Sequence, residues 1–170
     1  MSKILNIDSP VFAFMAKIAA ELGDTDKAAY YQAWFEDVKR TTNEFLWSEE
    51  DGFYFDYNIE EGKLHKVWAV SSFLPLFAGI CNEAQAEKLV THLQDPESFC
   101  TAFPIPSISK KDQTFGTDMW RGPVWLNFNY MILCGLKEYG YQDVYREILD
   151  KTVSNMDRWY QTSGVIFEFY

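Results

Sequence analysis

Hydrophobic residues recur at helical spacing along most of the chain, in segments separated by turn residues. A first helix is predicted to begin at Ser9 and Pro10, a favourable cap and first-turn pair, and to end before Gly23. Its apolar face consists of Val11, Phe12, Met15, Ile18, Ala19 and Leu22. Thr25 can cap a second helix that runs to about residue 46. The stripe of that helix consists of Tyr31, Trp34, Phe35, Val38 and Phe45. These segments predict an antiparallel pair of helices.

After the second helix, the spacing of hydrophobic residues changes from the helical period to alternation. The pair Asp51-Gly52 favours a turn, and aromatic residues occupy alternate positions after it. A second turn at "EEGK" then predicts a small β-hairpin within residues 53 to 70. Further helices are predicted at about 66 to 80, 83 to 94, 123 to 138 and 141 to 161. The helix at 123 to 138 would begin with Pro123 at its first position. The long connection before Pro123 is rich in Pro and Ser. Loops of this length are usually functional or disordered, and the aromatic residues of this one favour order.

About six helices joined as αα-hairpins predict a mainly α fold. Two architectures are open to such pairs, an open solenoid of repeats or a closed toroid. The stretch "ELGDTDKAAYYQAW" resembles a tetratricopeptide-type helix turn. It does not recur at a fixed period of about 34 residues, as a solenoid requires. The sequence therefore favours the toroid.

Composition narrows the class of protein. A chain of 170 residues with 48% apolar content can bury one substantial core, which indicates a single domain. The net charge of −10 argues against nucleic acid as a partner, because such binding depends on clustered Lys and Arg. Three cysteines without metal spacing predict neither a disulfide framework nor a metal site, and no cofactor is expected. The first twenty residues make no convincing signal peptide and no segment is long enough to span a membrane, so a cytoplasmic protein is expected.

The candidate chemistry lies in "MWRGPVWLNFNY", residues 119 to 130. A sugar ring has apolar faces and polar edges, so a site for it combines flat aromatic side chains with amide, guanidinium and carboxylate groups. Trp120 and Trp125 would supply the faces. The edges would come from Asp118, Arg121 and Asn129. Gly122 would let the backbone approach closely. The alternative is that Trp125, Phe128 and Ile132 are the buried stripe of a helix.

Four segments carry a family resemblance, in this order: "GFYFDYN", "SFLPLFAGI", "FPIPSISKKDQTFGTDMWRGPVWLNFNYMILCGLKEYGY" and "GVIFEFY". Together they closely resemble bacterial and archaeal members of glycoside hydrolase family 63 and the related trehalase-like and mannosylglycerate-hydrolase-like enzymes. The resemblance covers residues 8 to 170. It implies an (α/α)6 toroid of twelve helices that hydrolyses α-glucosidic or α-mannosidic bonds with inversion.

The resemblance also implies roles for particular residues. Glu168, in the context Glu168-Phe169-Tyr170, would be the general base, and its aromatic neighbours would raise its pKa by desolvation. The sugar-binding motif maps onto Met119, Trp120, Gly122, Pro123 and Trp125. Asp118, Arg121, Asn129 and Tyr170 complete the candidate substrate site. Asp118 could contact the sugar, orient Arg121 or act as a negative charge at the start of a helix. Glu168 could instead be an exposed residue of an edge strand.

Three other sets of polar residues have simpler interpretations. Asp56 could lie in the site or in the hairpin turn. His65 and His92 are predicted to be surface or packing residues, and Glu49 to Asp51 a solvated turn.

The segment that holds the family's general acid, resembling "Glu-Ser-Gly-x-Asp-Asn-Ser", is not found in these 170 residues. We therefore expect a single partial domain, the C-terminal half of a catalytic domain, that is poorly active by itself and self-associates through an exposed apolar face. Its ligand would be a small glycoside or oligosaccharide. The alternative is a non-catalytic carbohydrate-binding or helical-repeat interaction module.

Overall fold

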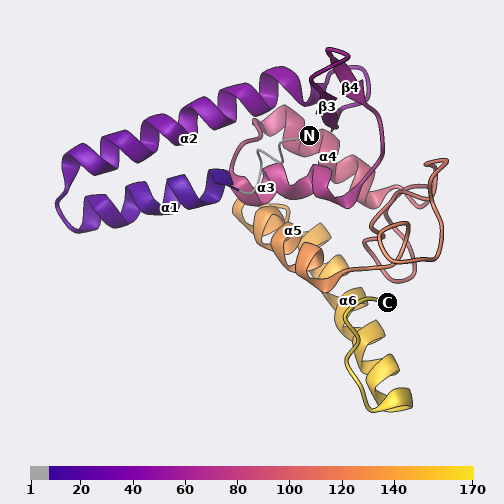
Figure 1. The fold of residues 1–170 in the computed structure, drawn as a ribbon. Helices are drawn as coiled ribbons and strands as arrows, with labels where there is room; N and C mark the ends of the chain where they lie inside the picture. Colours follow the sequence, from indigo (N-terminus) through magenta and orange to yellow (C-terminus); the bar gives the residue numbers. More distant parts are fainter. Residues whose placement is uncertain (1–7) are drawn as a thin grey trace.

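The computed structural model describes residues 8–170, and the side chains from Pro10 onward. The order of elements is two long helices, two short strand pairs, two shorter helices, a long irregular segment and two final helices (Figure 1). Within the described residues the fold is mainly α and built from αα-hairpins, as the sequence predicts. None of the described helices combines the length and apolar character needed to cross a bilayer.

The helices α1 (Asp8–Glu21) and α2 (Thr25–Phe45) form an antiparallel arm that extends from the rest of the molecule (Figure 1). Gly23 allows the turn between them, since its φ is 75°. The cap of α2 is Asp24, whose carboxylate accepts the Lys27 N–H at 3.1 Å. The predicted cap Thr25 is therefore wrong by one residue. The predicted Ser9 cap concerns a side chain outside the described part.

The apolar face predicted for α1 lies largely in solvent. Val11, Ile18 and Leu22 are 51%, 59% and 79% exposed. The buried residues of this helix are Pro10 and the small Ala16 and Ala19. The helical period was correct, but its large apolar side chains find little cover, because α1 packs chiefly on α2.

Two antiparallel pairs follow the arm. β1 (Trp47–Ser48) pairs with β2 (Phe53–Tyr54), and β3 (Asp56–Asn58) pairs with β4 (Lys63–His65). The second pair is the predicted hairpin with its turn at "EEGK", and Gly62 has φ 65° there. The first pair, closed over Asp51-Gly52, is an addition to the prediction.

The middle of the chain carries a 3₁₀ turn, η1 (Val70–Phe73), the short helix α3 (Leu74–Ala78) and α4 (Glu83–Gln94). Helix α4 has its predicted bounds and begins with a capping box between Asn82 and Gln85. The predicted helix at 66 to 80 is wrong in its first part. Trp68 C=O accepts Ser109 N–H at 2.8 Å and Val70 N–H donates to Ser107 C=O at 2.9 Å, so this backbone pairs with the long loop instead.

The last helices are α5 (Leu126–Glu138) and α6 (Gln142–Ser163). Gly164 ends α6 with φ 71°, and the chain then runs back alongside α6 (Figure 1). The predicted start of α5 at Pro123 is wrong. Val124 exchanges two backbone hydrogen bonds with Tyr170, at 2.7 and 3.0 Å, and Pro123 C=O accepts Ser107 N–H at 3.1 Å. These contacts hold residues 123 to 125 extended.

An aromatic core lies beneath the strand pairs. Phe53 is fully buried and contacts Trp68, Phe73 and Phe99, with ring centroids 4.7, 5.3 and 5.9 Å away. Residues of α4 and α5 complete this core, among them Leu89, Leu93, Ile132 and Leu136. The core therefore joins the strand pairs to α4 and α5, and it supports the base of the long irregular segment.

Candidate functional site

The tip of the irregular segment is a turn that ends in an ion pair. The Arg121 guanidinium donates to both carboxylate oxygens of Asp118, at 2.7 and 2.9 Å, and Arg121 N–H donates to Asp118 C=O at 2.9 Å. Both side chains are exposed, and the hydrogen bonds from Arg121 lower the pKa of Asp118. The structure thus pairs Asp118 with Arg121, which fits the orienting role, one of the three roles open from sequence.

Two tryptophans stack at the base of this turn. The rings of Trp120 and Trp125 are nearly parallel, at 3°, with centroids 3.7 Å apart. Trp120 is 48% exposed, whereas Trp125 is 6% exposed and donates its indole N–H to Met119 C=O at 3.0 Å. Trp125 therefore serves as the support, and Trp120 presents an aromatic surface to solvent. Phe128 contacts the edge of Trp120 at 6.0 Å.

The turn has a constrained backbone. Met119 has φ 44°, unusual for a residue with a side chain, and Gly122 has φ 141°. A Cβ atom on Gly122 would lie 2.0 Å from Gly116 C=O. Glycine is needed here because the two arms of the loop approach each other closely, with Gly116 N–H donating to Arg121 C=O.

The C-terminal segment lies against this motif. Phe169 forms an isolated antiparallel bridge with Trp125, and their ring centroids are 5.1 Å apart. Tyr170 is half-buried, pairs with Val124 and contacts the ring of Phe103 at 5.0 Å. The fold thus brings "EFY" next to "WRGPVW", as the family resemblance implies.

Three predicted properties of site residues are wrong. Trp125, predicted to offer a face to the sugar, is 6% exposed and packs against Trp120 and Phe169. Glu168 is exposed in this chain, so the expected desolvation of its carboxylate is absent. Asn129, predicted to face the sugar, is 1% exposed. Its amide nitrogen donates to Pro104 C=O at 2.7 Å and the Thr152 hydroxyl at 3.0 Å, and its oxygen accepts Ile105 N–H at 3.3 Å. Asn129 holds the loop instead of presenting its amide to a ligand.

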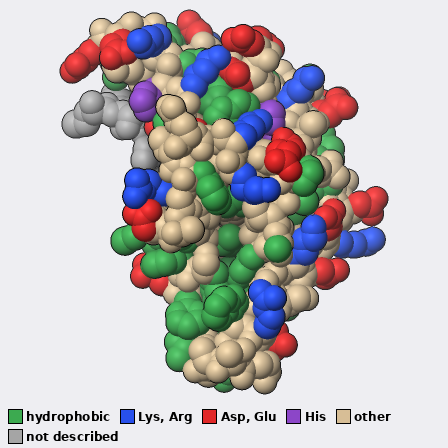
Figure 2. Space-filling view, turned by 90° about the vertical axis from the view of Figure 1, so that its right-hand side faces the viewer, with side chains coloured by type: hydrophobic (Ala, Val, Ile, Leu, Met, Phe, Trp, Pro, Cys, Tyr) green, Lys and Arg blue, Asp and Glu red, His purple; other side chains and the backbone are tan. Residues whose placement is uncertain are grey.

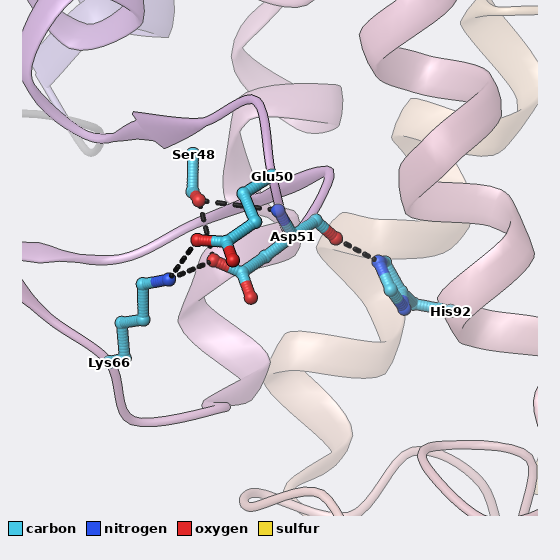
Figure 3. Close-up of polar contacts among 5 residues, drawn as sticks. All are labelled: Ser48, Glu50, Asp51, Lys66 and His92. Atoms are coloured by element: carbon cyan, nitrogen blue, oxygen red, sulfur yellow. Dashed lines mark hydrogen bonds and ion pairs between the residues drawn. The ribbon is translucent and has the colours of Figure 1, made fainter.

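Figure 3 shows a second polar cluster, between the first strand pair and α4. Asp51 accepts hydrogen bonds from Ser48 and Lys66, both at 2.5 Å; burial opposes ionisation, but these bonds prevail and lower its pKa. His92 Nε2 donates to Asp51 C=O at 3.0 Å, and burial lowers the pKa of His92. His92 is thus the packing histidine that the sequence predicts. Of the predicted solvated turn, Glu49 and Glu50 are exposed and Asp51 is not.

The exposed residue Asp56 lies on β3, where it pairs with His65. The hairpin interpretation therefore describes it better than a pocket role.

Sequence reasoning missed Ser107 and Thr152. Ser107 is 3% exposed, and its hydroxyl accepts Gly122 N–H at 2.9 Å. Small polar residues are common in loops and on helices, so nothing in their local pattern distinguishes these two.

The fold places the chain in the class of helical domains built from αα-hairpins, with a long loop carrying an aromatic motif. The family model described as mannosylglycerate hydrolase MGH1-like glycoside hydrolase domain matches residues 13–170. The chain belongs to this glycoside hydrolase family.

Similar proteins support this membership. The mannosylglycerate hydrolase of Rubrobacter radiotolerans is 30% identical over 76% of this chain and 30% of the relative. The mannosyl-oligosaccharide glucosidase of Saccharomyces cerevisiae is 30% identical over 87% of this chain and 19% of the relative. The solved family 63 mannosylglycerate hydrolase from Thermus thermophilus, in complex with glucose, matches with a TM-score of 0.82 and 25% identity. That match covers 91% of this chain and 38% of the solved chain.

The chain spans less than two fifths of the length of each of these relatives. The yeast neutral trehalase, at 19% identity and a TM-score of 0.85, shares the fold. None of the relatives named here is described as a non-catalytic module.

Proposed function

We propose that this chain is the C-terminal part of the (α/α)6 catalytic domain of an inverting α-glycosidase that acts on a small glucoside or mannoside. The observation that carries the proposal is the bridge between Trp125 and Phe169. This bridge sets Phe169, the residue beside Glu168, against the stacked tryptophans, which supports assigning an aromatic surface and a carboxylate to one site.

Each group has a proposed task. The exposed face of Trp120 packs on the C–H face of a sugar ring, and the Asp118–Arg121 pair offers polar groups to its hydroxyls. Glu168 activates a water molecule as the general base. The general acid belongs to a part of the family domain that this chain does not span. Inverting hydrolysis needs the two carboxyl groups about 6.5–9.5 Å apart, which leaves room for that water.

Exposure of Glu168 and of the surrounding apolar residues fits a partial site. Val165, Ile166 and Phe167 are 51%, 63% and 40% exposed. Figure 2 shows hydrophobic side chains gathered on the lower part of one face, the level of α6 in Figure 1. We propose that the missing part of the domain covers this region and that the chain alone self-associates through such surfaces.

The test compares hydrolysis of aryl α-glucosides and α-mannosides by the chain alone and by the chain extended at both ends with its flanking coding sequence. The extended protein is expected to be active and the chain alone nearly inactive. Glu168→Gln in the extended protein should lower kcat by about 10²–10⁴-fold. Glu60→Gln, at an exposed residue of the hairpin turn, is the matched control and should not change kcat. An extended protein with full activity after Glu168→Gln would refute the assignment of the base.

A further inference from the structure

Ser107 lies behind the tryptophan motif, and its N–H, its C=O and its hydroxyl oxygen each take part in a hydrogen bond. Its N–H donates to Pro123 C=O at 3.1 Å, and its C=O accepts Val70 N–H at 2.9 Å. Its hydroxyl accepts Gly122 N–H at 2.9 Å. The side chain is only 3% exposed, so water competes little for these bonds. Ser107 therefore connects the core beside η1 to the two residues at the centre of the motif.

The bond to Gly122 fixes an unusual piece of backbone. Gly122 holds φ 141°, which favours glycine but does not by itself select this conformation, because glycine has many others open to it. The Ser107 hydroxyl selects the one that points the Gly122 N–H inward. Without the hydroxyl, this amide would lose its partner at a half-buried place.

The position of Trp120 depends on the same turn. Its ring contacts are with Trp125 and Phe128, at centroid distances of 3.7 and 6.0 Å, and nearly half of its surface is in solvent. Trp125 is anchored separately, by burial and by its bond to Met119 C=O. The orientation of Trp120 is thus set by the backbone that leads into Gly122.

We propose that Ser107 is a positioning residue that, through the Gly122 amide, holds Trp120 stacked on Trp125. The consequence for sugar affinity rests on the function proposed above. The stacking itself does not, so the two can be tested separately.

Two closely stacked indoles couple electronically and give an exciton band in the far-ultraviolet circular dichroism spectrum. Trp120→Phe in the 170-residue chain identifies this band by removing it. Ser107→Ala should reduce the band by about half, because the turn loses the hydrogen bond that fixes the Gly122 amide, while the bonds of Arg121 to Asp118 and Gly116 remain. Ser98→Ala is the matched control. Ser98 is fully buried in the same irregular segment, but its hydroxyl pairs with Ser109 and not with the motif.

Ser107→Thr keeps the hydroxyl and should keep the band, which separates the hydrogen bond from general packing. Thermal unfolding followed at the α-helical signal should show similar midpoints for Ser107→Ala and Ser98→Ala. Equal bands in Ser107→Ala and Ser98→Ala, or loss of the band in Ser107→Thr with folding intact, would overturn the proposal.

Binding of D-glucose to the extended protein and to the same variants made in it, followed by tryptophan fluorescence, tests the consequence. Ser107→Ala should raise the dissociation constant about fivefold or more, and Ser98→Ala should leave it unchanged. An extended wild-type protein that binds no glucose, while the exciton band of the 170-residue chain still depends on Ser107, would contradict the proposed function and support the positioning role. Glucose binding that does not change in Ser107→Ala, together with an unchanged band, would overturn the positioning role alone.

Discussion

Replacing Asn129 by leucine should destabilise the folded chain severely. The side chain of Asn129 is 1% exposed and makes three hydrogen bonds, to Pro104 C=O, Ile105 N–H and the Thr152 hydroxyl. Leucine has a similar volume but leaves all three groups without this partner. Each unsatisfied buried group costs about 1–3 kcal/mol, so we expect the loss of these partners to lower the free energy of unfolding by about 3–5 kcal/mol.

Urea denaturation of wild-type and variant chains measures this loss, and the thermal midpoint should fall by about 10 °C or more. Asn127→Leu is the control, because Asn127 is exposed two residues earlier on the same helix. That variant should stay within about 0.5 kcal/mol of wild type. Equal stability of Asn129→Leu and Asn127→Leu would refute the view that Asn129 ties the irregular segment to α5 and α6.

Two further variants test other parts of the account. Burial lowers the pKa of His92 below its unfolded value of about 6.5, so the unfolded chain binds a proton more readily than the folded chain. The free energy of unfolding should therefore decline as the pH falls below about 6.5. Urea denaturation at a series of pH values should show that His92→Gln removes this part of the pH dependence. A variant whose free energy of unfolding changes with pH as in wild type would contradict the prediction. The control is His65→Gln, because His65 is exposed. Ile166→Glu, at a residue 63% exposed in the C-terminal segment, should weaken self-association in sedimentation velocity, and a wild-type chain that is monomeric at high concentration would contradict the expectation.

The elements that the sequence predicted well are those that local interactions determine. Helix α4 has a capping box and a clean apolar stripe, and the β3–β4 hairpin has its turn residues. Both signals lie within a few residues of the element itself. The family resemblance, carried by ordered motifs, similarly predicted that the segment around Glu168 meets the tryptophan motif.

Several of the failures share one physical cause, hydrogen bonding to the backbone of segments far apart in sequence. Residues 66 to 69 and 123 to 125 read as helical, but their N–H and C=O groups bond to the irregular segment and to Tyr170. Asn129 sits among aromatic residues that favour a sugar site, yet the backbone at Pro104 and Ile105 needs its amide. The sequence contains both the donor and the acceptor of each of these hydrogen bonds, but it does not show that the fold brings them together.

The stereochemistry of hydrolysis tests the central claim most directly. Proton NMR can record which anomer an extended form of the chain first releases from an aryl α-glucoside or α-mannoside. The account predicts that the β-anomer appears first and that Glu168→Gln abolishes its release, because a general base beside the tryptophan motif directs water to the opposite face of the sugar. First release of the α-anomer, or release that Glu168→Gln leaves unchanged, would contradict it.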